Sequence, residues 1–598
     1  MCGIVGYIGH EDVKEILLKG LERLEYRGYD SAGIGILNQS GNVSVYKEVG
    51  RVEHLRSLID SNEKAHVGIG HTRWSTHGEP SRLNAHPHQS KNGRFTIVHN
   101  GVIENEDFLR STYFPSFEFK SETDTEILVE LLNKYVEEYG EVELAIKQLM
   151  KSLHGSYALG IIDNLEPNKL YAVKNKSPLL IGLGDGFNMI GSDAMAMIIK
   201  TNQFYEVNDL EYAILTKDEI KIFDINGKSI TRDYFVANID KNEVDKGTYP
   251  HYMIKEIDEQ AFVMRRILEK YLDQHHEKFI IDEDIVKALK EADRLYIIAA
   301  GTSYHAGLIG KRMFEKLANI PVEVYVASEF IYNEPILSKN PLFIFISQSG
   351  ETADSRAVLV HIKQLGYKSL TITNVENSTL AREANYNLLI HAGPEIAVAS
   401  TKAYTGQIAI LTICAYVIAE TKDFDLVHEL SMVANVIESI CDRKEVLKHL
   451  ASEYLKTTRN CFYIGRQIDY AVALEAALKL KEISYIQTEG FAAGELKHGT
   501  IALIEKGTPV IALISQEEVN LNTRSNVKEV RSRGAKTLTI SLESFSKETD
   551  QFIIDDVHPL LTSLVMVIPT QILAYYAALE RGLDIDKPRN LAKSVTVE

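Results

Sequence analysis

Short apolar runs separated by glycine and asparagine dominate the first 240 residues of the chain. They include GIVGYIG, SAGIGILN, VGIGHTR, RFTIVHNG, SYALGIID and EYAILTKDEIKIFDING, and this pattern predicts β-strands. A helical pattern is confined to two stretches, EDVKEILLKGLERLE and TDTEILVELLNKYVEEYG. Many strands with few, grouped helices indicate a layered α+β domain.

Beyond about residue 250 strands alternate with helices, which is the pattern of a doubly wound α/β sheet. This half of the chain also repeats itself. RLYIIAAGTSYHAGLIGKRMFEKL resembles CFYIGRQIDYAVALEAALKLKEI, and PLFIFISQSG resembles TPVIALISQE. Ser347 pairs with Ser515 and Gly366 pairs with Gly534, both at an offset of 168 residues. Two equal offsets predict a duplicated domain.

One apolar segment, PLLTSLVMVIPTQILAYYAAL at 559–579, is long enough to cross a membrane. Pro569, Thr570 and Gln571 stand at its centre, and the segment is alone in a long chain of globular composition. We therefore expect a buried core or interface helix pair and no membrane association.

Composition and charge narrow the class of protein. The 598 residues suggest three or four domains at roughly 150 residues each, and 45% apolar with 25% charged residues is ordinary for a globular protein. A net charge of −18 argues against a general affinity for nucleic acid or acidic membranes. The four cysteines have neither metal-like spacing nor disulfide density, and no secretory signal is recognisable, so we expect a reducing cytoplasm.

The two copies of the repeat differ where a strand runs into the next helix. SQSGETADS of the first copy supplies Ser347, Ser349, Gly350 and Thr352, whose hydroxyls and backbone amides suit an anion at a helix N-terminus. The second copy has SQEEVNLN, with two glutamates that would repel an anion. Ser and Thr could instead merely cap the helix, but capping needs one such residue. We expect a phosphate site in the first copy alone, with Ser303 at the neighbouring strand end.

Cys2 follows Met1, and removal of Met1 would place a free α-amine and a thiol on one residue. A lone cysteine near a strand is more often a small buried apolar residue than a nucleophile. Three further segments, HTRWSTHG, IVHNGVIEN and SETDTE, favour the interpretation of Cys2 as a nucleophile. Asn100 and Gly101 are suitable donors to an oxyanion. Arg73 and Asp124 could bind the carboxylate and ammonium of an amino acid, although they could also be a surface charge and a helix cap.

The motifs MCGIVGYIG, YRGYDSAGI, GHTRWSTHG, HNGVIEN and SETDTE together resemble the class II glutamine amidotransferase domain. SQSGETADS, AVASTKAYT, ALKLKEISYI, GELKHG and PRNLAKSVTVE resemble the paired sugar isomerase domains of the glutamine:fructose-6-phosphate amidotransferase family. The resemblance covers essentially the whole chain. It implies an αββα N-terminal-nucleophile glutaminase domain followed by two doubly wound α/β sugar isomerase domains. The expected bounds are 1–238 for the glutaminase, 239–250 for a linker, 251–425 and 426–581 for the isomerase domains, and 582–598 for a catalytic tail.

The resemblance also implies an activity, the formation of glucosamine 6-phosphate and glutamate from fructose 6-phosphate and glutamine, without a metal or organic cofactor. Its expected catalytic residues are Cys2, Asn100, Gly101, Glu482, His498, Lys593 and Lys479. The glutamine-binding residues would be Arg73, Thr76, His77 and Asp124, and Trp74 would gate an ammonia channel. The sugar-phosphate residues would be Ser303, Ser347, Gln348, Ser349 and Thr352. Cys2 would be the nucleophile, Glu482 the base between C1 and C2, and Lys593 the Schiff-base lysine. His498 would open the sugar ring and come from the neighbouring subunit of a homodimer.

Departures from the family pattern are small: Thr500 and Ala476 stand where the family often has Pro and Gly. No long insertion precedes the linker, which is typical of the bacterial form, and we expect no end-product feedback. Two alternatives stay open. A phosphoribosylpyrophosphate-type amidotransferase should carry an acidic phosphoribosyl-binding loop, which we do not find. A hexose-phosphate-binding regulator would bind sugar but release no glutamate from glutamine.

Overall fold

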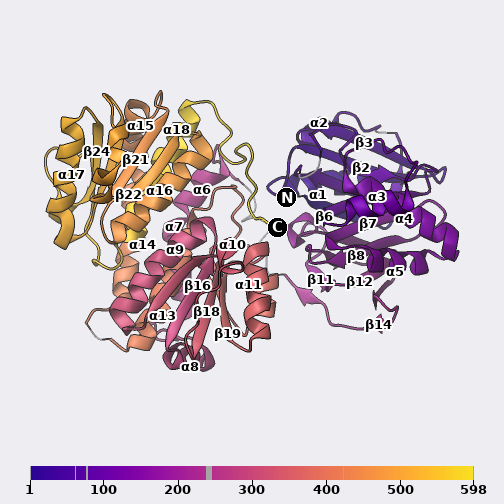
Figure 1. Ribbon diagram of the computed structural model, residues 1–598, viewed down its shortest axis with the longest axis horizontal. Coiled ribbons are helices and arrows are strands. Elements are labelled where there is room, and N and C mark those ends of the chain that lie inside the picture. The colour runs from indigo at the N-terminus through magenta and orange to yellow at the C-terminus, as the bar shows by residue number, and fades with distance from the viewer. Residues whose placement is uncertain (1, 61, 76–77, 238–245, 422, 597–598) are drawn as a thin grey trace. The chain divides into compact units, whose positions relative to one another are not determined.

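The computed structural model describes residues 2–60, 62–75, 78–237, 246–421 and 423–596. The chain divides into two compact units, Met1–Glu243 with Ser594–Glu598 and Val244–Lys593 (Figure 1). Most of the predicted linker 239–250 lies outside the described residues. The next helix, α6, begins at Tyr252.

The first unit contains two antiparallel sheets. The eight-stranded sheet has the order β15-β11-β9-β10-β1-β4-β2-β3 and comprises β1 Gly3–Ile8, β2 Ser31–Asn38, β3 Val43–Val49, β4 Ala65–Arg73, β9 Leu180–Leu183, β10 Asn188–Gly191, β11 Gln203–Glu206 and β15 Phe235–Val236. The seven-stranded sheet has the order β14-β13-β12-β8-β7-β6-β5 and comprises β5 His88–Gln89, β6 Phe95–Ile103, β7 Gly155–Asp163, β8 Leu170–Asn175, β12 Glu211–Leu215, β13 Ile220–Asp224 and β14 Ser229–Ile230.

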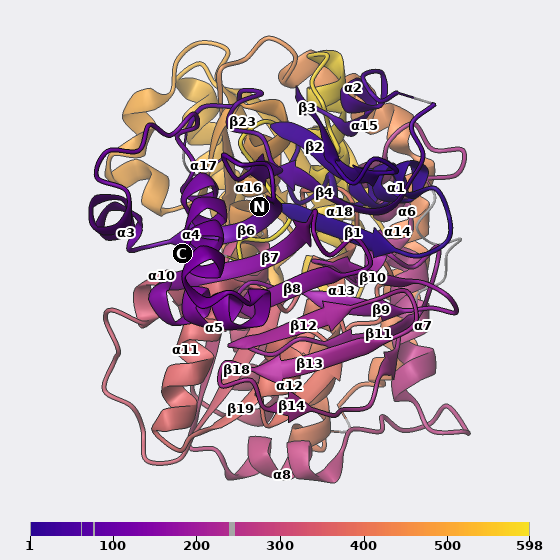
Figure 2. The ribbon, with the colours of Figure 1, turned by 90° about the vertical axis from the view of Figure 1, so that its right-hand side faces the viewer.

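Because side chains alternate along each strand, the apolar residues of this unit form three cores, one between each pair of neighbouring layers. Ile4 and Ile69 of the first sheet meet Val98 of the second in a core between the sheets. Val5 and Tyr7 face the opposite way and pack against helix α1, Val13–Leu24. On the outer face of the second sheet, helices α4, Asp124–Tyr139, and α5, Val142–Ser152, cover β6, β7 and β8 (Figure 2). The order is therefore helix, sheet, sheet, helix, as predicted.

The prediction that helices in this unit are confined to two stretches is wrong. The two predicted helices are α1 and α4, but the structure adds α2, Val52–Arg56, α3, Glu106–Tyr113, and α5. In α5 the residues Ala145, Ile146 and Leu149 are buried against the second sheet. Its apolar residues follow the i, i+3, i+4, i+7 spacing of an amphipathic helix, so the sequence carried this signal and the prediction overlooked it.

The second unit contains two parallel five-stranded sheets with equivalent strand order, which confirms the predicted duplication. The first, β17-β16-β18-β19-β20, comprises β16 Arg294–Ala299, β17 Val322–Val326, β18 Pro341–Ser347, β19 Lys368–Thr373 and β20 Tyr386–Leu389. The second, β22-β21-β23-β24-β25, comprises β21 Asn460–Gly465, β22 Gln487–Ala492, β23 Pro509–Ile514, β24 Lys536–Leu542 and β25 Phe552–Ile554.

Helices cover both faces of each sheet, as a doubly wound fold requires. They are α6 Tyr252–Asp258, α7 Gln260–Tyr271, α8 Glu283–Glu291, α9 Gly301–Met313, α10 Ala327–Phe330, α11 Ala353–Gln364, α12 Thr379–Glu383, α13 Lys402–Ala419, α14 Leu426–Asp442, α15 Lys444–Tyr454, α16 Ile468–Ser484, α17 Asn520–Ser532 and α18 Thr562–Glu580. In β18, Phe343 and Phe345 pack with α11, whereas Ile344 and Ile346 belong to a core shared with α9 and α13. This core continues into the second copy through α16 and α18.

Two described helices, α13 and α18, are long and apolar enough to cross a membrane by length and composition alone. Their most apolar windows are 83% and 89% buried inside the protein, as core helices are. The predicted helix pair at 559–579 is a single helix, α18, with Pro569 inside it. Packing of α18 against α15 and α16 holds the helix together across the missing proline N–H.

Candidate functional site

Cys2 precedes β1 and lies next to the end of β4 in the first unit. The backbone N–H of Trp74 donates to Cys2 Sγ at 3.3 Å, and the side-chain Nδ2 of Asn100 donates to the Cys2 carbonyl at 3.1 Å. Burial, the largest influence, raises the pKa of the Cys2 thiol, while the Trp74 N–H and the Arg73 guanidinium act in the opposite direction. A neighbouring base is therefore needed to deprotonate this thiol near neutral pH.

Asn100 and Gly101 follow each other in β6, opposite Ala158 and Tyr157 of β7. Gly101 has φ +139°, and a Cβ built there would lie 1.9 Å from the carbonyl oxygen of Ser156. Only glycine fits this backbone. This glycine stands within the paired part of β6, at the residue where an oxyanion donor is predicted.

Arg73 and Asp124 are both nearly inaccessible to solvent. Arg73 ends β4 and donates to the carbonyl oxygen of Gly78 at 3.3 Å, and burial lowers its pKa. Asp124 is the first residue of α4, where the helix dipole favours a carboxylate, and it accepts from the N–H of Ile103 at 3.0 Å. Trp74 packs edge-on against Tyr29, with ring centroids 5.9 Å apart. The predicted residues Thr76 and His77 lie outside the described residues.

The loop between β18 and α11 in the second unit contains four of the five predicted sugar-phosphate residues, and contacts within it join Ser347, Gly350 and Thr352. The Ser347 hydroxyl lies 3.0 Å from the Thr352 hydroxyl and accepts from the N–H of Gly350 at 3.0 Å. Gly350 has φ +66°, and a Cβ there would lie 1.9 Å from the hydroxyl of Ser378. Thr352 occupies the N-cap position of α11 without a side-chain cap hydrogen bond. Its hydroxyl is therefore not used for capping, which favours the ligand interpretation of this loop over the capping one.

The equivalent edge of the second copy is filled by a carboxylate of the protein itself. Asp469, in the first turn of α16, accepts from the Ser515 N–H at 2.8 Å and from the Ser515 hydroxyl at 2.5 Å. Burial, the main cause, raises the pKa of Asp469 to about 6. Because Ser515 is the counterpart of Ser347, the donors that would bind a phosphate in this copy already have a partner.

Helix α16 carries a buried lysine between two carboxylates. Lys479 Nζ lies 2.7 Å from Glu482 Oε2 and 3.4 Å from Glu475 Oε1, and it donates to the Thr302 hydroxyl at 2.8 Å. The other oxygen of Glu475 is 2.7 Å from His305 Nδ1. Burial lowers the pKa of Lys479, but the two carboxylates outweigh it and the net pKa is raised. Burial raises the pKa of Glu482 against the opposing charge of Lys479. Glu482, about a fifth exposed, is thereby suited to accept and return a proton.

Lys593 inserts into the segment between β20 and α13. Its Nζ donates to Glu395 Oε2 at 2.5 Å, to the Ala397 carbonyl at 2.9 Å and to the Ser400 hydroxyl at 3.2 Å. Burial opposes ionisation of Glu395, but Lys593 and the N–H groups of Ala403 and Thr401 outweigh burial and lower its pKa to about 2. Lys593 is also among the charges that lower the pKa of Glu482, so the two groups share one electrostatic environment.

A second carboxyl, Glu256 of α6, supports this segment from behind. Its Oε1 accepts from the N–H groups of Ile396 and Ala397. Burial, followed by the charge of Glu395, raises the pKa of Glu256 to about 8, against the opposing effect of Lys593 and Lys402. Near neutral pH the segment that holds Lys593 therefore contains one ionised carboxylate, Glu395, and contacts one protonated carboxyl, Glu256.

The other residues predicted to act on the sugar lie outside these hydrogen-bonded clusters. The Ser303 hydroxyl, in α9, accepts from Gln407 at 3.0 Å, and Gln348 and Ser349 are half-buried in the β18–α11 loop. His498 ends the short helix η3, Glu495–His498, and its side chain is exposed. The described residues contain no group of three His, Cys, Asp or Glu arranged to hold a metal ion.

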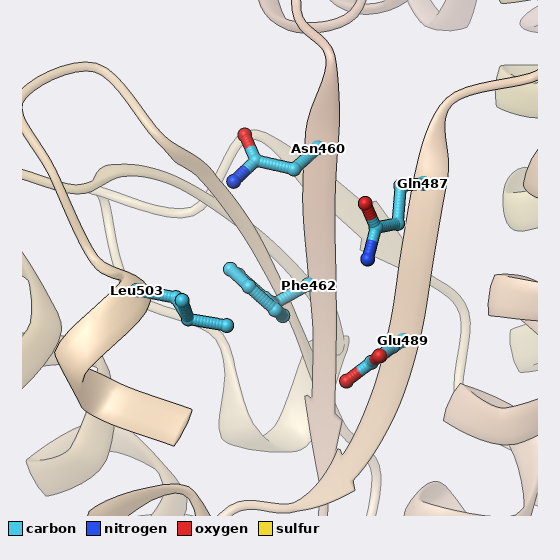
Figure 3. A pocket seen from close by; sticks show the side chains of 5 residues that line it. All are labelled: Asn460, Phe462, Gln487, Glu489 and Leu503. Atoms are coloured by element: carbon cyan, nitrogen blue, oxygen red, sulfur yellow. The ribbon is translucent and has the colours of Figure 1, made fainter. Parts of the chain in front are cut away.

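A pocket lies at the edge of the second sheet of the repeat (Figure 3). Asn460 and Phe462 of β21 and Gln487 and Glu489 of β22 line it, together with Leu503 of the short helix η4, Thr500–Leu503. None of these five lining residues is a predicted site residue, and we assign this pocket no role.

Comparison with known proteins finds a different domain family in each of the two units. The model of the glutamine amidotransferase domain matches residues 71–198, and that of the SIS domain matches residues 288–416 and 454–581. The glutamine–fructose-6-phosphate aminotransferase [isomerizing] of Geobacillus kaustophilus is 62% identical over the full length of both chains, and that of Bacillus subtilis is 59% identical over the same span.

The chain belongs to the glutamine–fructose-6-phosphate aminotransferase family. A solved C-terminal domain of glucosamine-fructose-6-phosphate aminotransferase from Francisella tularensis is 34% identical, with a TM-score of 0.55, and covers 57% of this chain and 99% of its own. Tagatose-6-phosphate ketose/aldose isomerase from Escherichia coli, 18% identical with a TM-score of 0.50 over 56% of this chain and 96% of its own, shows the fold alone. The predicted family, fold class and enzyme class are confirmed.

The sequence prediction missed several polar residues of the isomerase cluster. Glu475 stands four residues before Lys479 and seven before Glu482, so all three share one helix face, and this spacing could have indicated it. Glu256 and Glu395 lie far from Lys593 in sequence and no local pattern connects them. Thr302 and His305 were visible in AAGTSYHAG but were not distinguished from their neighbours.

Proposed function

We propose that this chain transfers the amide nitrogen of glutamine to fructose 6-phosphate and isomerises the product, yielding glucosamine 6-phosphate and glutamate. The observation that supports this most directly is identity of 62% over the whole length of a relative that bears this name. The two clusters described above supply one set of groups for each half of the reaction.

In the glutaminase half, Cys2 Sγ attacks the side-chain amide of glutamine to form a thioester, which water then hydrolyses to glutamate. With Met1 removed, the α-amine of Cys2 takes the thiol proton and passes it to the amide nitrogen, which then leaves as ammonia. The Nδ2 of Asn100 and the N–H of Gly101 stabilise the oxyanion. Arg73 and Asp124 bind the α-carboxylate and the α-ammonium of glutamine. Thr76 and His77 complete this proposed glutamine site, and Trp74 gates the passage of ammonia.

In the isomerase half, the phosphate binds to the proposed sugar-phosphate residues Ser303, Ser347, Gln348, Ser349 and Thr352. The Lys593 amine forms a Schiff base with the C2 carbonyl of the open-chain ketose, releasing water. Glu395 supports this step because its carboxylate, 2.5 Å from Lys593 Nζ, holds the lysine side chain in place. Ammonia from the glutaminase half then displaces the Lys593 amine from C2 and leaves an imine there. Glu482 takes a proton from C1 and returns it to C2, which yields the C2 amine and the C1 aldehyde.

Lys479 supports Glu482 in this proton transfer, because their ion pair couples the charge of one to the other. His498 opens the sugar ring from the neighbouring subunit of a homodimer. Its exposed position at the end of η3 is compatible with this role. We also propose a cytoplasmic enzyme with the domain bounds 1–238, 251–425 and 426–581, and a catalytic tail at 582–598.

The test is a balance of products from purified protein given glutamine and fructose 6-phosphate, with Cys2→Ala in parallel. We expect equal amounts of glutamate and glucosamine 6-phosphate from the unmodified chain. Cys2→Ala should make neither product. Glutamate without amino sugar would contradict the acceptor, and amino sugar from glutamine with Cys2→Ala would contradict the nucleophile.

A further inference from the structure

His71, in β4, contacts the residue proposed as an oxyanion donor. Its Nε2 lies 2.9 Å from the carbonyl oxygen of His99 and 3.1 Å from Oδ1 of Asn100. A backbone carbonyl can only accept, so the hydrogen between these atoms belongs to His71 Nε2. The amide atom of Asn100 beside the same N–H must then be its oxygen. Contact with the His99 carbonyl thus determines both the tautomer of His71 and the orientation of the Asn100 amide.

The His71 ring is also held neutral. It is completely buried and stacks on the ring of His86, with centroids 4.1 Å apart. Its Nδ1 has no hydrogen-bond partner among the described residues. Burial, the main cause, lowers the pKa of His71 to about 3, and the charge of Arg73 acts in the same direction. A single Nε2–H donor therefore faces Asn100 throughout the neutral pH range.

The orientation matters because the two ends of the Asn100 amide have opposite polarity. With Oδ1 accepting from His71, Nδ2 points to the Cys2 carbonyl at 3.1 Å, next to the proposed nucleophile. A rotation by 180° would present Oδ1 to the developing oxyanion and repel it. Cys2 is the second residue of the chain, whereas His71 belongs to a central strand, so the rigid contact comes from His71.

We infer that His71 is a positioning residue for glutamine hydrolysis, which orients the Asn100 amide so that its N–H faces the oxyanion. This inference rests on the proposed function, in which Asn100 stabilises that oxyanion. Loss of one oxyanion-hole donor costs about 10²–10³ in kcat. A variant without the Nε2–H leaves Asn100 in place but free to rotate, so we expect a kcat about 10–100-fold lower and a KM for glutamine within about twofold.

The decisive experiment is a double-mutant cycle in the full-length chain, with glutamate release from glutamine measured in the presence of fructose 6-phosphate. The variants are His71→Phe, Asn100→Ala and the two combined. We expect the double variant to be no slower than Asn100→Ala alone, within about twofold. Binding of fructose 6-phosphate should be unchanged in all three, since the isomerase half is untouched.

Two matched variants, His71→Gln and His71→Asn, distinguish the effect of the N–H donor from the effect of losing the imidazole ring. In His71→Gln the amide nitrogen stands four bonds from Cα, as Nε2 does in histidine, and should restore most of kcat. In His71→Asn the nitrogen is one bond too close and should behave like His71→Phe. This pair of near-isosteric variants also replaces His71→Phe if the phenylalanine variant does not fold.

The outcomes distinguish the inference from the proposed function. Three results would each overturn the positioning role while leaving the oxyanion proposal intact. The losses in kcat of the single variants could multiply in the double variant, or His71→Phe could have an unchanged kcat. The third result is a kcat of His71→Gln as low as that of His71→Asn. An Asn100→Ala variant with unchanged kcat would overturn the oxyanion proposal and the positioning role together.

Discussion

Replacing Glu256 with glutamine should make the stability of the second unit less dependent on pH. The carboxyl is 1% exposed, and its pKa of about 8 in the folded protein exceeds the value of 4.5 that an unperturbed glutamate has. A carboxyl with a raised folded pKa stabilises the fold fully only below its unfolded pKa. Its contribution is lost as the pH rises from about 4.5 through 8, because ionisation then favours the unfolded chain.

The magnitude follows from the two pKa values. Each pKa unit corresponds to about 1.4 kcal/mol, so the shift corresponds to about 5 kcal/mol lost across this pH window. For a unit of about 350 residues, an unfolding entropy of about 2.1 cal/mol/K per residue converts this to a difference in Tm of about 7 °C. Glu256→Gln cannot ionise, so its Tm should rise relative to that of the unmodified chain by about 5 °C between pH 5 and pH 8.5, a window that contains about 4 kcal/mol of this loss.

The assay is thermal unfolding of the full-length chain and the variant in a pH series at constant ionic strength. A difference in Tm that is the same at every pH indicates altered packing, and it does not affect the pH dependence of that difference. Glu291→Gln, which removes a half-exposed carboxylate from α8 of the same unit, is the control. A Tm difference between Glu256→Gln and the unmodified chain that stays constant from pH 5 to pH 8.5 would refute the reasoning. Glu256 would then be ionised in the folded protein.

Three further predictions concern the proposed sites. Ser347→Ala should raise the KM for fructose 6-phosphate about tenfold or more by steady-state kinetics, because it removes a hydrogen bond to a charged group. Ser515→Ala, its matched counterpart in the second copy, should leave that KM unchanged and contradicts the one-site assignment if it does not. Lys593→Arg should abolish the covalent adduct that borohydride forms with fructose 6-phosphate, seen by mass spectrometry, while glutaminase activity persists; an adduct at another lysine would disprove its role. Gly101→Ala should lower Tm by several degrees and abolish glutaminase activity, because its Cβ would meet the carbonyl of Ser156. Unchanged activity would argue against a role for this backbone.

Local patterns in the sequence were sufficient for the architecture of the second unit. Strand and helix periodicities record which face of each element is buried, and two equal offsets recorded the duplication. The difference between the equivalent loops of the two copies was also readable, since hydroxyls and a glycine in the first are replaced by acidic residues in the second. The structure adds that Asp469 occupies the donors of the second loop, which its place in α16 did not reveal.

What the sequence by itself determined was therefore the layers, the repeat and the residues that carry recognisable motifs. Only the tertiary structure decided which polar groups share an environment. Glu256, Glu395 and Lys593 come from three separate segments, and His71 meets Asn100 across two sheets. The physical reason is that hydrophobic periodicity records the burial of a residue but not its neighbours. The pKa of a buried carboxyl and the orientation of a buried amide depend on groups that become close only when the chain is folded.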